Sequence, residues 1–332
     1  MNGALRTVLL IALASVLAAS AAGSAPEQTP ADLPEYNPAI AGLLAEVNES
    51  ELFITVADLQ SFETRVVGTD GNREAAAYLY DRLSDTAGLD VSYQGGDLAN
   101  VVATLPGTDP ASDSVVVIGA HYDSISSDPE HAPGATDNGV GVAVVLELAR
   151  IMSQYRFDET VEFAFWNAEE VGLNGSRSYT RHAAEGNVSI PLYLNYDAAG
   201  YDPENRSQLN ILYNAEAEDL VDLVVHDLAL YNISLTPIRD PSTYRSDHIS
   251  FWEQGYPALM THAPWPHGPV HTPADTVDAV SFPYAAKNAR LGLAVLAEVA
   301  GLNGAPGKAF SWEGVFPIFG RTPPAIFGHR QV

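Results

Sequence analysis

The chain has 332 residues, no cysteine and a formal net charge of −26 at pH 7, and 46% of its residues are apolar. This length and apolar content can fill one large domain core or two small ones. The negative charge excludes nucleic acid and anionic membranes as partners, because their phosphate groups would be repelled. The lack of cysteine excludes disulfides and leaves histidines and carboxylates as zinc ligands, which is typical of catalytic rather than structural zinc sites.

The first residues have the pattern of a secretory signal peptide. Arg6 precedes an apolar stretch at 7–17 that is too short to span a bilayer, and Ala19-Ser20-Ala21 offers a cleavage site. We therefore expect residues 1–21 to be removed and the protein to be secreted or to lie on the exterior of the cell envelope, without stable membrane contact. A retained membrane anchor is the alternative. Residues 22–38 are rich in proline, alanine and acids, and we expect a flexible leader there.

Helical and strand patterns then alternate along the chain. Helical spacing is found at 39–62, 75–83, 139–152, 173–182, 215–230, 247–254 and 283–299, with a turn at 70–72. Strand patterns are found at 89–93, 100–105, 114–120, 161–166, 191–196, 209–213 and 258–261. The alternation predicts an α/β fold, a three-layer sandwich with a mixed, mostly parallel central sheet. We expect one catalytic domain at 39–302, followed by a tail at 303–332 that is rich in glycine, proline and phenylalanine.

Acidic and imidazole side chains follow several of the predicted strands. They are His121 and Asp123 after 114–120, Glu169 and Glu170 after 161–166, Asp197 after 191–196, Asp137 before the helix at 139–152, and His271 in a late loop. Ligands of open α/β sheets bind outside the carboxyl ends of the strands. Each residue alone has an ordinary explanation, such as Asp137 capping a helix. Together, two histidines and several carboxylates suit a pair of zinc ions with open positions.

These residues stand in short sequence words. The words are His121-x-Asp123, Gly134-Ala135-x-Asp137-Asn138-x-x-Gly141, Glu169-Glu170-x-Gly172-Leu173-x-Gly175-Ser176, Asp197, Ser246-Asp247-His248 and His271-Thr272-x-x-Asp275-Thr276. Their order and wording resemble the secreted di-zinc aminopeptidases of clan MH, which include bacterial leucyl aminopeptidases. The resemblance runs from about residue 57 to residue 301. It implies a zinc-dependent exopeptidase fold and the release of N-terminal residues from peptides. We expect the protein to be a monomer.

The resemblance also implies which residues bind metal. His121 and Asp197 would bind one zinc ion, and Glu170 and His271 would bind the other. Asp137 would bridge the two zinc ions together with a water or hydroxide, because a carboxylate offers two oxygens to two cations.

Four further roles follow from the same resemblance. Asp123 would orient His121 by accepting its second ring N–H. Glu169 would be the general base that takes the proton of the attacking water and passes it to the leaving amine. Tyr244 and Arg245, which precede the word at 246–248, would contact the substrate or the developing oxyanion. For Arg245 a surface salt bridge is an equally good interpretation.

Three other functions remain open at this stage. A glutaminyl cyclase, an acyltransferase with one zinc ion, resembles the chain in three stretches. These are His121-Tyr122-Asp123-Ser124, Gly134-Ala135-Thr136-Asp137 and Leu146-Glu147-Leu148-Ala149-Arg150. Cyclases usually carry tryptophan before the last histidine ligand, whereas this chain has Val270 there. A carboxypeptidase of the same clan would share the metal ligands but needs a basic cluster, for which Arg245 alone is thin support. A binding protein on a degenerate peptidase fold would lack a ligand, and none is missing.

Overall fold

The computed structural model describes residues 33–240 and 244–304. The predicted signal peptide at 1–21, the leader up to residue 32 and the tail from residue 305 lie outside the described residues. Within the described ranges, no helix combines the length and the apolar composition that crossing a membrane requires.

The described residues form strands and helices that alternate along much of the chain. The strands are β1 (Asp90–Gln94), β2 (Asn100–Leu105), β3 (Val115–His121), β4 (Arg156–Phe157), β5 (Thr160–Trp166), β6 (Tyr193–Tyr196), β7 (Gln208–Tyr213), β8 (Thr236–Arg239), β9 (Ala258–His262) and β10 (Leu302–Gly304). The α-helices are α1 (Pro38–Leu44), α2 (Glu49–Gln60), α3 (Asp70–Ser84), α4 (Val140–Met152), α5 (Asn174–Glu185), α6 (Glu218–Leu230), α7 (His248–Trp252) and α8 (Phe282–Val299).

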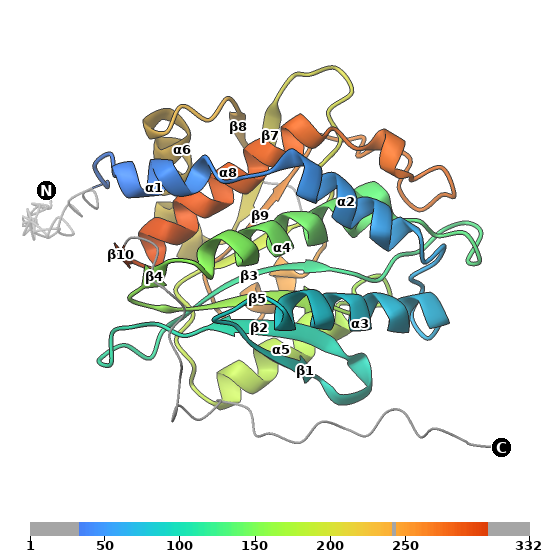
Figure 1. Cartoon of the computed structure of the whole chain (residues 1–332), viewed down its shortest axis with the longest axis horizontal. Coiled ribbons are helices and arrows are strands. Elements are labelled where there is room, and N and C mark those ends of the chain that lie inside the picture. The colour runs from blue at the N-terminus through green and yellow to red at the C-terminus, as the bar shows by residue number, and fades with distance from the viewer. Residues whose placement is uncertain (1–32, 241–243, 305–332) are drawn as a thin grey trace, which may run out of the picture. The chain divides into compact units, whose positions relative to one another are not determined.

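One eight-stranded sheet runs through the middle of this part of the chain, in the order β1-β2-β5-β3-β6-β9-β7-β8 (Figure 1). The central strands β5, β3, β6 and β9 are parallel to one another. Antiparallel neighbours flank them, β2 beside β5 and β7 beside β9. The predicted mixed, mostly parallel sheet is therefore confirmed. Because parallel strands end at the same edge, the segments that follow β5, β3 and β6 meet there.

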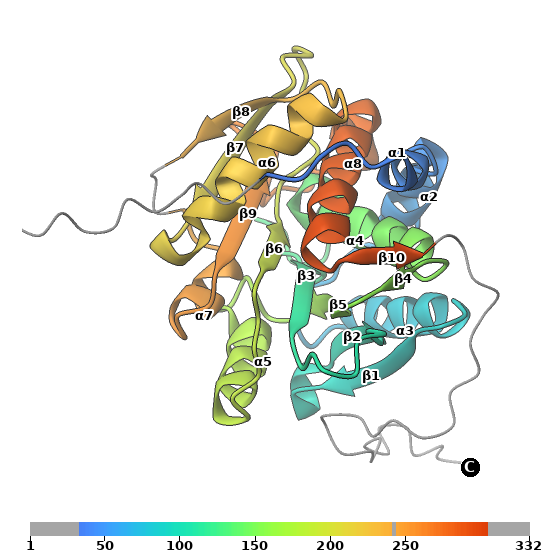
Figure 2. The same ribbon diagram turned by 90° about the vertical axis from the view of Figure 1, so that its left-hand side faces the viewer.

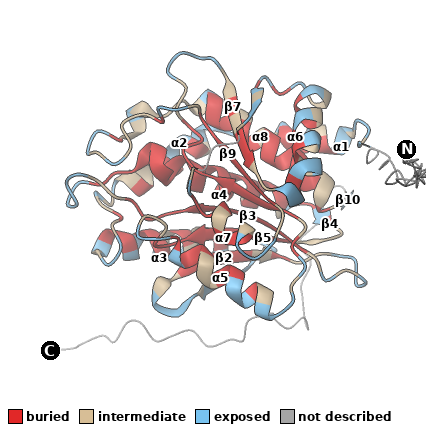
Figure 3. Ribbon diagram, turned by 180° about the vertical axis from the view of Figure 1, so that it is seen from behind, coloured by how far each residue is buried: buried red, intermediate tan, exposed pale blue. Residues whose placement is uncertain are grey.

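Helices cover both faces of the sheet (Figure 2). The larger core lies under α1, α2, α3, α4, α6 and α8, and the smaller core lies under α5 and α7. Strand β3 contributes to both cores, with Val116, Ile118 and Ala120 in the larger and Val115 and Val117 in the smaller. Successive side chains of a strand point to opposite faces, which explains why β3 is apolar up to its last residue, His121. Figure 3 shows the buried sheet between helices whose outer sides are exposed.

Two predicted elements differ from the structure. The predicted helix at 39–62 is two helices, because the Asn48 side chain caps a new one by accepting a 2.9 Å hydrogen bond from Ser50 N–H. The predicted turn at 70–72 is the first turn of α3, where Thr69 Oγ1 accepts a 3.2 Å hydrogen bond from the backbone of the third helical residue. Strands β4, β8 and β10 were not predicted: β4 has two residues, β10 has three, and three of the four residues of β8 are exposed.

Candidate metal centre

The carboxyl ends of β3, β5 and β6 bring together the residues that the sequence placed after these strands. His121 is the last residue of β3 and lies opposite Trp166, the last residue of β5. Glu169 and Glu170 follow Trp166 within four positions, and Asp197 directly follows β6. Because β3 pairs with both β5 and β6 in parallel, these side chains meet at one edge of the sheet.

Asp137 lies between two histidines. Its Oδ1 is 3.2 Å from Nε2 of His121, and its Oδ2 is 3.0 Å from Nε2 of His271. Asp197 Oδ1 lies 3.7 Å from the His121 nitrogen, and Glu170 Oε2 lies 3.4 Å from the His271 nitrogen. The side chains thus form an inner trio (His121, Asp137 and Asp197) and an outer trio (Asp137, Glu170 and His271), and within each trio the ligand atoms lie within 4.8 Å of one another. Asp137 belongs to both trios.

The donor set of the two trios fits zinc. Three of their buried atoms have no hydrogen-bond partner among the described residues, namely His121 Nε2, Asp197 Oδ1 and Glu170 Oε1. Buried polar atoms are nearly always hydrogen-bonded, so three orphaned atoms in one cluster point to an additional group that they would bind. Imidazole nitrogens and carboxylate oxygens are the ligands of catalytic zinc sites.

The segment that carries Asp137 is held from two sides. The Asp275 carboxylate accepts hydrogen bonds from Thr136 N–H at 2.8 Å, from the Thr136 hydroxyl at 2.6 Å and from Asp137 N–H at 3.1 Å. On the other side, the Asn138 amide donates to the carbonyl of Tyr196, the last residue of β6, at 2.7 Å. The segment is therefore fixed both to the loop after His271 and to the end of β6.

Asp123 organises the same edge in two ways. Nδ1 of His121 lies 3.1 Å from the Asp123 carbonyl oxygen and 3.6 Å from its carboxylate, so the carbonyl is the nearer partner. A carbonyl only accepts, which places a proton on Nδ1 and directs Nε2 toward the acids, where a metal ion would take the place of its proton. The carboxylate accepts hydrogen bonds from the backbone N–H groups of Glu169 at 3.1 Å and Glu170 at 3.2 Å. Asp123 thus positions both glutamates as well as the histidine.

The ionisable groups of the centre perturb one another strongly. Burial, reinforced by the charge of Asp137, raises the pKa of Glu170 to about 7. Hydrogen bonds to Asp137 and Glu170 raise the pKa of His271 to about 10. Burial alone would lower the pKa of His121, but the charge of Glu169 and the surrounding carboxylates raise it well above its usual value. Burial also raises the pKa of Glu169 well above its usual value. Without a metal, protons balance the negative charge here, and metal binding would displace them.

Of the two predicted substrate contacts, the structure brings one to the centre. The Tyr244 ring stacks on His262, with ring centroids 5.6 Å apart, and the charge of Asp197, followed by burial, raises the pKa of its hydroxyl. Arg245 is exposed. The pKa of Glu253 is lowered chiefly by its hydrogen bond with Arg177, and the charge of Arg245 lowers it further.

Sequence reasoning missed one charged residue of this region. Arg65 is fully buried, and the acids whose charges raise its pKa against the effect of burial include Asp275, Asp123 and Asp137. It lies in the connection between α2 and α3, and it is not part of any sequence motif. Asp275 was visible as part of a sequence word, but its hydrogen bonds to the Asp137 segment could not be read from the sequence.

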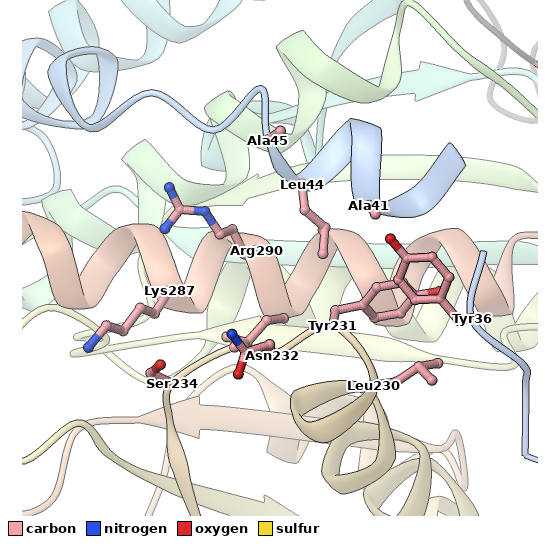
Figure 4. A pocket seen from close by; sticks show the side chains of 11 residues that line it. Tyr36, Ala41, Leu44, Ala45, Leu230, Tyr231, Asn232, Ser234, Lys287 and Arg290 are labelled. Carbon is pink, nitrogen blue, oxygen red and sulfur yellow. The ribbon is translucent and has the colours of Figure 1, made fainter. Parts of the chain in front are cut away.

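A groove of about 500 Å³ lies elsewhere, among α1, α8 and the end of α6 (Figure 4). Tyr36 and Tyr231 line one end of the groove, and Lys287 and Arg290 line the other. None of the predicted site residues lines it, so it is separate from the metal centre.

The strand ends that build the centre lie within a segment that matches a known family. Residues 100–296 match the family described as Peptidase family M28. This match covers more than half of the chain. The chain belongs to peptidase family M28. The family resemblance inferred from the sequence words is thereby confirmed, and hydrolysis of peptide bonds is the chemistry of the family.

Named relatives of this M28 chain include leucine aminopeptidases. It is 27% identical over 293 residues to leucine aminopeptidase 1 of Leptosphaeria maculans. This alignment covers 80% of this chain and 74% of that protein. It is 28% identical over 287 residues to a probable leucine aminopeptidase of Trichophyton verrucosum. That alignment covers 78% of this chain and 75% of the relative.

Solved structures share the fold. The LapA aminopeptidase of Legionella pneumophila superposes with a TM-score of 0.72 at 21% identity, covering 82% of this chain and 78% of that one. A glutaminyl cyclase of Fimbriiglobus ruber superposes with a TM-score of 0.65 at 17% identity, covering 80% of this chain and 98% of that one. At such identities the likeness shows the fold alone, so it does not separate a peptidase from a cyclase.

Proposed function

We propose that this protein is a zinc-dependent aminopeptidase that holds two zinc ions and hydrolyses N-terminal residues from peptides. The observation that carries the proposal is Asp137, whose two oxygens face His121 at 3.2 Å and His271 at 3.0 Å. Each carboxylate oxygen has its own lone pairs, so one carboxylate can serve two cations. Membership of family M28 and the similarity to leucine aminopeptidases support the activity.

The ligands divide between the two trios. His121 and Asp197 would hold one zinc ion, Glu170 and His271 would hold the other, and Asp137 would bridge both. When bound, the zinc ions would lower the pKa of a coordinated water and polarise the scissile carbonyl. The protein contributes the positions of these five side chains, four of which are buried or nearly so before any ligand arrives.

Glu169 is the member of the glutamate pair that the ligand set leaves free, and we assign it as general base. Its carboxylate would take the proton of the attacking water and pass it to the leaving amine. Asp123 fixes its backbone through a 3.1 Å hydrogen bond, which holds the side chain at the edge of the metal centre. Burial raises the pKa of Glu169 in the metal-free protein, and the positive charge of bound zinc would lower it again, so that the carboxylate could accept a proton.

Tyr244 is our candidate for contact with the substrate or its developing oxyanion. Its ring stacks on His262, and the charge of Asp197 raises the pKa of its hydroxyl. Arg245 stays a weaker candidate, because its exposed side chain could reach a substrate only from the rim. The acidic composition would favour a substrate with a free, cationic α-amine.

We further propose that the protein acts as a secreted monomer on peptides outside the cell. The pattern of residues 1–21 supports export, and the peptidase family supports peptide substrates.

A substrate panel and a zinc determination test the proposal together. We expect two zinc ions per chain, cleavage of leucyl anilide, and no cleavage of N-acetyl-leucyl anilide. One zinc ion with pyroglutamate formation from a glutaminyl peptide would replace the proposal by a cyclase. Shortening of an N-acetylated peptide from its free C-terminus would replace it by a carboxypeptidase.

A further inference from the structure

We propose that Arg65 is a positioning residue that sets the zinc affinity of the centre by clamping the chain segments that carry the ligands, an inference that rests on the proposed function. Arg65 lies in the connection between α2 and α3, and its side chain is fully buried. A buried arginine is costly unless its donors and its charge are both satisfied.

The guanidinium joins two of the ligand-bearing segments. Its Nε donates to the Tyr122 carbonyl at 2.7 Å, and Tyr122 directly follows the ligand histidine of β3. Its Nη1 donates to the Pro133 carbonyl at 2.6 Å, and its Nη2 donates to the Gly134 carbonyl at 2.9 Å, just before the segment that carries Asp137. The guanidinium is planar and rigid, so these bonds fix the distance between the two segments.

The backbone of Arg65 reaches the third segment. Its carbonyl accepts a hydrogen bond from the Asn72 amide at 3.0 Å. Asn72 and Asn167 exchange two side-chain hydrogen bonds, at 3.0 and 3.1 Å. Asn167 directly follows β5 and stands two positions before Glu169. One residue therefore connects the ends of β3 and β5 with the Asp137 segment.

The hydrogen bonds of Arg65 and its positive charge would have opposite effects on zinc affinity. Within the described residues, the hydrogen bonds of the Arg65 guanidinium all go to backbone carbonyls, so its positive charge is balanced by acids at longer range. If the hydrogen bonds matter most, their loss loosens the segments and weakens zinc binding. If the charge matters most, its loss removes a repulsion and strengthens zinc binding.

Two substitutions separate these effects. Arg65→Lys keeps the charge without the fork of donors, and Arg65→Met removes both. We expect both variants to bind zinc about 10- to 100-fold more weakly than the wild type, the range seen when groups that orient metal ligands are changed. The zinc dissociation constant would be measured by competition with a fluorescent chelator, and thermal unfolding would be followed with EDTA and with zinc.

Arg150→Lys is the matched control, because this arginine of α4 also donates to a backbone carbonyl, that of Glu46 at 3.0 Å, but is remote from the ligands. Its zinc affinity should equal that of the wild type. A folded Arg65 variant whose stability in EDTA falls while its zinc affinity stays unchanged would overturn the inference, as would tighter zinc binding by Arg65→Met.

A milder variant covers the case in which the Arg65 variants do not fold. Ser124 Oγ accepts from the Arg65 N–H at 3.2 Å and donates to the Ala132 carbonyl at 2.7 Å, so Ser124→Ala loosens the same junction without stranding a charge. We expect a smaller loss of zinc affinity, and an unchanged affinity would count against the clamp. Wild-type protein that binds no zinc would instead refute the proposed function, which keeps the two failures distinct.

Discussion

The two trios of the metal centre are built in different ways. In the inner trio, the side chains of His121 and Asp197 are 1% and 4% exposed and come from the ends of neighbouring parallel strands. In the outer trio, the His271 side chain is 50% exposed and comes from a loop, where its φ of 59° lies in the left-handed region that few non-glycine residues adopt. A strand end positions a side chain more firmly than a loop does. We therefore expect the inner trio to hold zinc more tightly.

The largest effect is expected from replacing Asp137, the ligand that the two trios share. Asp137→Ala removes the ligand common to both, so zinc content should fall from two ions to less than one per chain, and activity should fall by about 10³-fold or more. Zinc would be measured by mass spectrometry after gel filtration. Asp222→Asn, which alters an exposed acid of α6 that pairs with Arg239, should change neither quantity. Two retained zinc ions in Asp137→Ala would contradict the bridging role.

Glu169→Gln should separate catalysis from metal binding. The substitution leaves all five ligands in place, so two zinc ions should remain. The loss of the general base should lower kcat by about 10²- to 10⁴-fold with leucyl anilide. Steady-state kinetics beside a zinc determination on the same sample would check this. Undiminished turnover would end the general-base assignment.

The difference between the trios predicts unequal effects of the two histidines. His271→Ala should keep one tightly bound zinc ion, because the inner trio stays complete. His121→Ala should keep only zinc that dialysis against a mild chelator removes, because the exposed outer trio is left. Equal zinc retention by the two variants would mean that burial does not rank the two sites.

The smallest expected effect is on pH dependence. In the metal-free protein the pKa of Glu170 rises from 4.5 to about 7 and that of His271 rises from 6.5 to about 10. The folded state thus binds more protons than the unfolded chain across this range, so its free energy of unfolding should fall as pH rises from about 4.5 to 10. Zinc displaces these protons, so zinc affinity should rise with pH over the same range.

Chelator competition and urea unfolding in EDTA at pH 6 and pH 9 would measure the two quantities. Burial also raises the pKa of Asp227 to about 7, so the comparison of wild type with His271→Ala isolates the contribution of the outer trio. Zinc affinity that does not change with pH would contradict the proton displacement.

Much of the fold was readable because its strands are buried on both faces. The apolar run of β3 predicted a central strand, and the polar residues after β3, β5 and β6 predicted where the site lies. Short edge elements such as β8 were missed, because three of its four residues are exposed and give no apolar pattern. The break between α1 and α2 was missed because it depends on the cap at Asn48 rather than on a change in hydrophobic spacing.

The sequence predicted the metal ligands of the candidate site but not the contacts that hold them in place. His121 and Glu170 are chemically distinctive and follow strands, so the sequence marks them. The hydrogen bonds of Arg65 go to backbone carbonyls, which every residue has, so no sequence pattern marks that contact. The same holds for Asp123, whose carboxylate accepts hydrogen bonds from backbone N–H groups.

Stepwise addition of zinc to the metal-free protein, with hydrolysis of leucyl anilide measured at each step, tests the two-metal centre most directly. The shared position of Asp137 predicts saturation at two zinc ions per chain, with the first bound more tightly than the second. Saturation at one zinc ion, with no further change in binding or activity, would contradict it.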